Sequence, residues 1–140
     1  MIITYDINEI KLQKNQYWKT LGTLYITLEN NLYEFKACSG GYKRGTIPIG
    51  RYKVGFAEEL PDTPEYAGFK GEEFPWGAKL DPIGKCEDSQ GKRTGLYIHG
   101  KGTVEGTLGC LEILEDDVYC YNILRDAWKE AQMLLILEVV

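Results

Sequence analysis

Apolar and polar residues alternate along several short stretches in the first half of the chain. In residues 24–28 and 32–38 every second position is apolar, and a polar stretch at 29–31 separates the two. Alternation with period two is typical of a strand with one buried face, and a polar turn between two such strands predicts a β-hairpin. Residues 50–56 alternate in the same way, so we expect a meander of antiparallel strands here.

The pattern changes in the middle of the chain. Residues 57–94 hold four of the five prolines, and no period survives there for more than a few positions. We expect an irregular segment. A long irregular stretch in a compact domain is often functional, although a tolerated surface insertion explains the same pattern. Short apolar strands are expected after it, at 95–99 and at 111–113.

One helix is expected near the C-terminus. From Val118 to Ala131 apolar residues recur at three-to-four spacing, and Glu115 or Asp116 can begin the helix. The final "MLLILEVV" is continuously apolar and rich in β-branched residues, as in a buried strand. The order of elements predicts a mostly β domain with one C-terminal helix.

Composition narrows the class of protein. The chain of 140 residues is 44% hydrophobic, enough for one core, so we expect a single domain over 1–140. Its 16 basic residues are scattered among 21 acidic ones, which argues against nucleic acid as a partner. The first residues resemble neither a signal peptide nor a membrane anchor, so we expect synthesis in the cytoplasm and no membrane partner. Four isolated cysteines predict reduced thiols.

The only histidine, His99, ends an expected strand, and Cys110 follows eleven residues later. An imidazole beside a thiol can take its proton and make it a nucleophile. A glycine-rich loop between the two lets the chain turn back and lets backbone N–H groups point into a concavity, as an oxyanion hole requires. The alternative is a buried cysteine and an ordinary histidine at the end of a strand.

A metal site is a weaker interpretation. His99, Cys86, Cys110 and Cys120 are separated by 13, 11 and 10 residues in chain order, without the close pairs that are usual in structural zinc sites. The glycines after His99 do not have the spacing of a dinucleotide-binding loop. We therefore expect no metal and no cofactor.

Two short motifs, "YIHG" and "TLGCLEI", resemble the L,D-transpeptidase (YkuD-like) catalytic domain, in particular its small effector-like or phage-associated branch. The resemblance extends over residues 22–140. The matching positions are His99, Gly100, Thr107, Gly109, Cys110 and Leu111. Leu108 replaces a second histidine of the family motif, and Glu112 stands where arginine or asparagine is usual.

The resemblance implies an L,D-transpeptidase-like β-sandwich or open barrel with one helix, and a cysteine mechanism on peptidoglycan. Cys110 would attack the L,D bond of a stem peptide and form a thioester, with His99 as base and then acid. The Gly100 carbonyl would hold the histidine tautomer. Backbone N–H groups of Leu108, Gly109 and Cys110 would form the oxyanion hole.

Substrate contacts are expected from Trp76, Arg93 and Thr107, with residues 57–94 as one wall of a groove. An amine acceptor would make the enzyme a transpeptidase, and water would make it a carboxypeptidase. Action at the periplasm or cell wall would need a non-standard route, with a delivery or immunity protein as partner if the chain is a secreted effector. A non-catalytic wall-binding or structural module and a thiol hydrolase of another amide are the alternatives.

Overall fold

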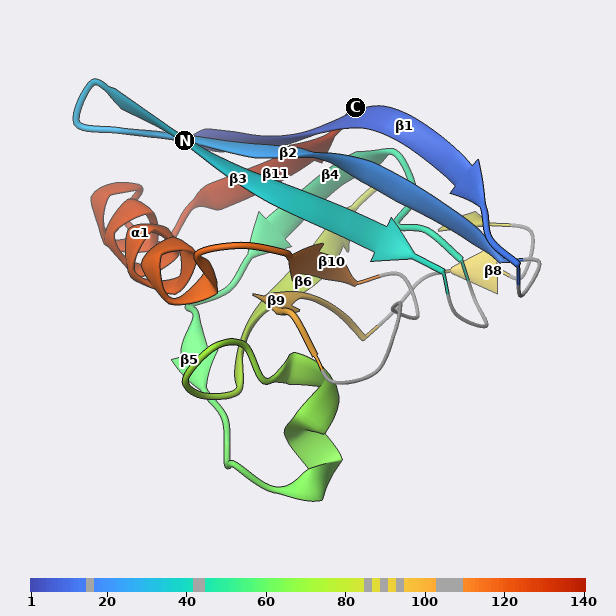
Figure 1. Ribbon diagram of the computed structural model, residues 1–140. Coiled ribbons are helices and arrows are strands. Elements are labelled where there is room, and N and C mark those ends of the chain that lie inside the picture. The colour runs from blue at the N-terminus through green and yellow to red at the C-terminus, as the bar shows by residue number, and fades with distance from the viewer. Residues whose placement is uncertain (15–16, 42–44, 85–86, 89–90, 93–94, 103–109) are drawn as a thin grey trace.

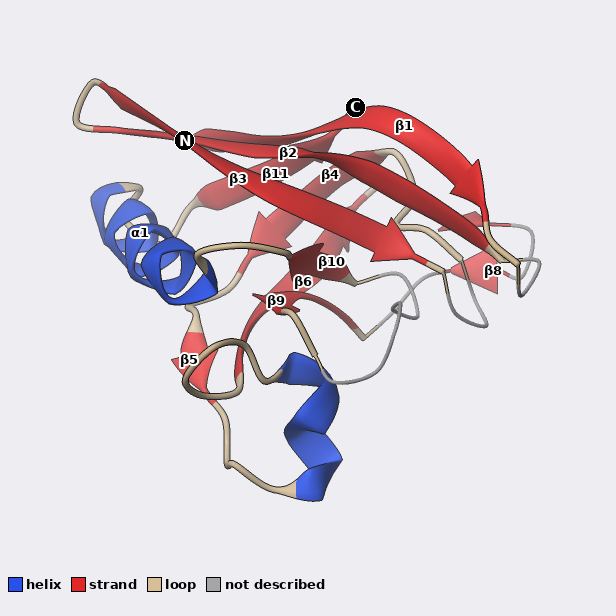
Figure 2. Cartoon of the chain, viewed as in Figure 1, coloured by secondary structure: helices blue, strands red, loops and turns tan. Residues whose placement is uncertain are grey.

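The computed structural model describes residues 1–14, 17–41, 45–84, 87–88, 91–92, 95–102 and 110–140, and most of them lie in strands (Figure 2). In chain order the elements are β1 (Ile2–Leu12), β2 (Trp18–Leu28), β3 (Asn31–Gly40), β4 (Gly50–Val54), β5 (Glu58–Glu59), the 3-10 helix η1 (Pro64–Phe69), β6 (Trp76–Ile83), β7 (Glu87–Asp88), β8 (Gly91–Lys92), β9 (Leu96–Gly100), β10 (Leu111–Ile113), α1 (Asp117–Glu130) and β11 (Leu135–Val139).

Eight strands of the described chain close into a barrel. Their order is β4-β11-β1-β2-β3-β10-β9-β6, and β6 pairs with β4 to complete the ring (Figure 1). The prediction of a mostly β domain with one C-terminal helix is confirmed. The choice between a sandwich and an open barrel needs correction, because the sheet closes on itself.

The expected hairpin is present as β2 and β3, joined by a tight turn. Glu29 and Asn30 have φ values of 51° and 65°, the left-handed conformation that suits a two-residue hairpin turn. The expectation of a meander is wrong beyond this hairpin. After β3 the chain leaves its neighbour, and β4 pairs with β11 and β6 instead.

Two long strands were not predicted from the pattern. β1 pairs antiparallel with β2 and parallel with β11, which joins the first and last parts of the chain. β6 lies inside the segment 57–94, where irregular structure was expected, and forms a central strand between β9 and β4. Only the part of that segment before β6, which includes η1, is largely irregular among the described residues.

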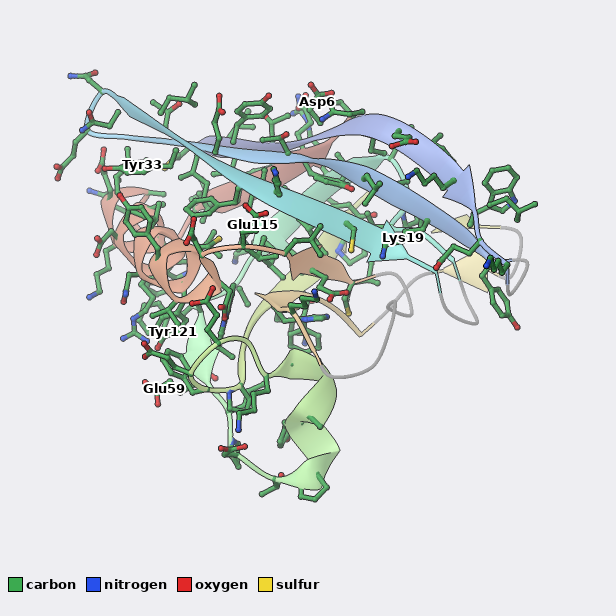
Figure 3. All side chains as sticks on the ribbon, in the orientation of Figure 1. Asp6, Lys19, Tyr33, Glu59, Glu115 and Tyr121 are labelled. Carbon is green, nitrogen blue, oxygen red and sulfur yellow. The ribbon has the colours of Figure 1, made fainter. Side chains whose placement is uncertain are left out.

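Helix α1 begins after Asp116, whose φ is 55°, close to the expected start. Its buried Tyr121 packs edge-on against Phe74 and Trp76, and Figure 3 shows this side chain on the face of α1 turned toward their segment. Arg125 lies over the Phe56 ring, 4.2 Å from its centre. No helix within the described residues is long and apolar enough to cross a membrane.

The barrel interior holds the hydrophobic core. Its strands contribute alternate residues, so the remaining side chains of each strand lie on the outer face of the barrel. The largest fully buried side chains include Tyr5, Tyr52, Leu24, Ile26, Leu80, Leu96, Ile98 and Leu111. On β9 and β10 the outer face is where the sequence places its candidate chemistry.

Candidate active site

The parallel pairing of β9 with β10 brings the predicted histidine and cysteine to one face. Ile98 lies opposite Leu111, and both are fully buried in the core. Their neighbours His99 and Glu112 lie opposite each other on the outer face. Cys110 directly precedes β10, so alternation predicts its side chain on the same face, and its Sγ lies 3.8 Å from the carbonyl oxygen of Gly95, just before β9. The two strands that carry the motifs thus lie side by side, while hydrogen-bond contact between His99 and Cys110 stays a prediction.

His99 is held on its edge and on its ring face. Its Nδ1 lies 2.6 Å from the Gly100 carbonyl oxygen, and the Phe69 ring from η1 stacks on it with a centroid distance of 4.6 Å and an interplanar angle of 30°. Phe69 also contacts Tyr97 edge-on. Only 3% of His99 is exposed, so η1 covers this part of the outer face.

These contacts determine the proton arrangement of the imidazole. A carbonyl oxygen only accepts hydrogen bonds, so Nδ1 must carry the hydrogen that it donates to Gly100. Burial lowers the pKa of His99 from 6.5 to about 4, although the Gly100 contact acts in the opposite direction. At neutral pH the ring is therefore neutral, with the Nε2 lone pair available as a base.

Cys110 is the most exposed of the three cysteines that the structure describes. It is 8% exposed, and its Sγ donates to the Gly95 carbonyl oxygen at 3.8 Å. Cys38 and Cys120 are fully buried, and burial raises the pKa of both thiols, that of Cys38 to about 12. A nucleophile must form a thiolate and reach solvent, which favours Cys110 over these two.

Several expected site residues lie outside the described part of the chain. They are Thr107, Leu108, Gly109, Arg93 and the fourth cysteine, Cys86. The expected oxyanion hole and two of the expected substrate contacts therefore stay predictions. Gly100 is placed as expected, with its carbonyl on the imidazole.

Trp76 is not a substrate surface in this structure, which corrects the sequence-based expectation. Its side chain is fully buried, and its indole Nε1 donates to the Asp117 carboxylate at 2.9 Å. It packs against Tyr121 of α1. The aromatic residue that contacts the histidine is Phe69 instead.

Asp117 is a buried residue near the site that sequence reasoning missed. It is 2% exposed and accepts hydrogen bonds from the Glu72 amide at 3.0 Å and from Trp76. A Cβ added at Gly100 would meet Asp117 Oδ2 at 2.7 Å, so the carboxylate lies directly against the backbone that orients His99. In the sequence it follows Glu115 and Asp116, and acidic residues are common at any helix start. The sequence therefore does not distinguish the buried Asp117 from its exposed acidic neighbours.

Glu112 is the second buried carboxyl group of the site. It is 4% exposed, and the Cys38 thiol donates to its Oε2 at 3.7 Å. Burial raises the pKa of Glu112, while Lys19, the Cys38 thiol, Lys101 and the Gly102 amide oppose the rise. In the sequence this residue is noticeable only as a departure from the family motif. The strand around it has three residues, too few for an alternating pattern to show which side chains face the core.

The described residues do not gather three His, Cys, Asp or Glu side chains in a metal-binding arrangement. Comparisons of the chain with protein-family models, curated proteins and solved structures found no match.

Proposed function

We propose that the protein is a cysteine acyl-transfer enzyme that cleaves the L,D bond of peptidoglycan stem peptides, with an L,D-transpeptidase-like fold. The observation that carries this proposal is the contact between His99 Nδ1 and the Gly100 carbonyl, on the same sheet face as Cys110. This contact leaves Nε2 without a hydrogen, and together with the stacked Phe69 ring it fixes the orientation of the imidazole. The mostly β content, the C-terminal helix and the two sequence motifs support the same family.

The reaction follows the usual course of thiol acyl transfer. Cys110 releases its hydrogen bond to Gly95 and gives its proton to His99 Nε2, and the thiolate attacks the carbonyl carbon of the third stem residue. The tetrahedral intermediate collapses to a thioester. His99 returns the proton to the departing amine of the terminal D-residue. A second amine then takes the acyl group to form a cross-link, or water releases the free acid.

The Phe69 ring would assist the proton transfer. When His99 accepts the proton it becomes an imidazolium in a buried site, where a charge is costly. The face of an aromatic ring attracts a cation, and Phe69 is already stacked on the imidazole at 4.6 Å. The imidazolium is therefore less costly beside the Phe69 ring than it would be in a purely aliphatic environment.

The burial of the pair favours one other candidate. With 3% of His99 and 8% of Cys110 exposed, a substrate carbonyl has little access in this conformation. A non-catalytic wall-binding or structural module on the same scaffold would also bury both residues. Turnover of a defined substrate separates the two candidates.

The test is incubation with a purified disaccharide tetrapeptide, followed by chromatography and mass measurement of the products. The proposal predicts loss of the terminal D-residue or formation of a dimer through the third stem residue, and neither product with Cys110→Ala. Cys120→Ala is the matched control, since this fully buried thiol of α1 belongs to the core, and we expect it to retain turnover. An inactive wild-type protein, or an active Cys110→Ala variant, would contradict the proposal.

A further inference from the structure

Asp117, at the start of α1, is a buried carboxylate that the proposed reaction does not use. Its Oδ1 accepts a hydrogen bond from the Glu72 amide at 3.0 Å, and its Oδ2 accepts one from the Trp76 indole at 2.9 Å. Both partners are N–H donors, which suits the acceptor-only carboxylate, and hydrogen bonds to a charged acceptor are the stronger kind. The carboxylate therefore ties α1 to the start of β6 and to the loop 70–75, which joins η1 to β6 (Figure 1).

Backbone contacts connect this loop to η1. Lys70 and Pro75 form an isolated antiparallel bridge that closes the loop, and the Lys70 amide donates to the Ala67 carbonyl oxygen of η1 at 3.3 Å. Glu72 is three residues from Phe69 along this hydrogen-bonded backbone. A constraint on the Glu72 amide therefore reaches the end of η1 that carries Phe69.

The loop also rests against the backbone that follows His99. A Cβ added at Gly100 would lie 2.7 Å from Asp117 Oδ2 and 2.8 Å from Gly71 Cα, so the carboxylate, the loop and the end of β9 meet at one point. His99 directly precedes Gly100, Phe69 lies two residues before Gly71, and the two rings stack at 4.6 Å. The anchored loop is thus the support on which this stacking rests.

We propose that Asp117 is a positioning residue: its two hydrogen bonds hold the loop against the end of β9 and so keep the Phe69 ring on His99. The proposal rests on the proposed function, in which the Phe69 ring favours the imidazolium formed during proton transfer. A ring that is already in place needs no rearrangement at that step, whereas a loop without its anchor lets Phe69 leave the imidazole.

Asp117→Asn weakens the anchor with almost no change in size. The amide has a single acceptor oxygen, so one of the two N–H donors faces an NH2 group instead. Asp116→Asn is the matched control, because it removes an equal charge from the same end of α1 at an exposed position. The Asp116 side chain forms no capping hydrogen bond, and asparagine tolerates its left-handed φ of 55°.

The ring protons of His99 report the position of Phe69. His99 is the only histidine, so its NMR signals are identified by their absence from the spectrum of His99→Gln. The ring current of a stacked phenyl group shifts the protons above its face upfield. Phe69→Leu keeps an apolar side chain without the ring, and its spectrum gives the positions of the His99 signals in the unstacked state.

We expect Asp117→Asn to move the His99 signals toward their positions in Phe69→Leu, and Asp116→Asn to leave them as in the wild type. Turnover of the tetrapeptide by Asp117→Asn should fall roughly tenfold in kcat with KM little changed, as for the loss of a desolvated cation–π contact. Because the effect passes through Phe69, Asp117→Asn should cause little further loss of kcat in the Phe69→Leu background.

An Asp117→Asn variant that melts earlier but keeps the wild-type His99 signals would overturn the proposal, because Asp117 would then have a structural role alone. An undiminished further loss of kcat in the Phe69→Leu background would overturn it as well. If the wild type has no turnover, the proposed function fails, and the His99 signals still decide the role of Asp117.

Hydrogen exchange of the wild type decides the case in which Asp117→Asn does not fold. Glu72 is exposed, so the protection of its amide depends on the hydrogen bond to Asp117. If the loop and Phe69 are released together, the Glu72 amide and the Nδ1 hydrogen of His99 should exchange through one opening, with the same dependence on urea below the unfolding transition. A Glu72 amide that exchanges freely, or a His99 hydrogen that exchanges through a different opening, would contradict the proposal.

Discussion

His99 combines two properties that a catalytic base needs, and both come from its immediate neighbours. The Gly100 carbonyl fixes the hydrogen on Nδ1, and burial under Phe69 keeps the ring neutral by lowering its pKa to about 4. The same contacts leave the imidazole with little access to solvent. The same burial makes the histidine a reporter of the folded state, because in an unfolded chain it would titrate near 6.5.

The lowered pKa of His99 predicts a loss of stability in acid. Above pH 6.5 the ring is neutral in both states and has no effect. Between pH 6.5 and about 4 the unfolded chain binds a proton that the folded protein does not, so the free energy of unfolding falls as the pH falls. The full loss is about 3 kcal/mol at roughly 1.4 kcal/mol for each pKa unit.

Urea unfolding at about pH 7.5 and about pH 4.5 measures this loss, with His99→Gln as the reference that lacks the group. Carboxyl groups such as Glu112 titrate in both proteins, so their effects cancel in the difference. The wild type should lose more stability than His99→Gln over this interval. Equal losses would mean that the imidazole is not buried in its neutral form.

At the scale of single residues, the sequence predicts those features that depend on residues close together in the chain. The contact between His99 and the Gly100 carbonyl was predicted from a motif around the unique histidine, while the catalytic roles of His99 and Cys110 stay predictions. Trp76 and Asp117 were misjudged or missed because their partnership spans 41 residues of sequence. Nothing in the chain near either residue indicates the other.

Among the elements, hairpin β2–β3, β4, β9, α1 and β11 were predicted because their periods are clear. β6 was not, because Gly77 and Pro82 interrupt its alternation; Pro82 lies where β6 pairs with β4, near the end of the strand. The alternation of β1 runs from Ile3 to Ile7 and changes phase at a register shift between Ile7 and Glu9, beyond which Ile10 and Leu12 are exposed. Closure of the barrel depends on both unpredicted strands, and neither parallel pairing can be read from local sequence.

The end of β9 has no room for a side chain, which gives a prediction at the scale of the element. In Gly100→Ala the new Cβ would lie 2.7 Å from Asp117 Oδ2 and 2.8 Å from Gly71 Cα, so backbone must shift. We expect a loss of about 1–3 kcal/mol in the free energy of unfolding, as for overpacked cores, together with reduced turnover.

Gly68→Ala is the control for this substitution in the stability measurement. A Cβ there would have no neighbour within 4 Å, so no loss of stability is expected. Chemical unfolding of both variants at neutral pH provides the comparison. If Gly100→Ala were as stable as Gly68→Ala, the close packing of this strand end against Asp117 and Gly71 would be contradicted.

At the scale of the whole molecule, the interior of the barrel and its outer face have different roles. The interior is filled with apolar side chains and supplies the stability, while the outer face of β3, β10 and β9 holds Cys38, Glu112, His99 and Cys110. Phe69 of η1 covers His99 on this face, and Asp117 of α1 lies beside Gly100 at the end of β9. Buried polar groups on an outer face are costly unless they have partners, and this arrangement is expected of a site that performs chemistry.

The most direct test of the central claim is the mass of the protein during reaction with a tetrapeptide stem. Rapid acid quenching and peptide mapping should find an acyl group, equal to the stem without its terminal D-residue, on the peptide that contains Cys110. Cys110→Ala should carry none, and His99→Gln should acquire it much more slowly. An adduct on another cysteine, or turnover without any acylated Cys110, would contradict the account.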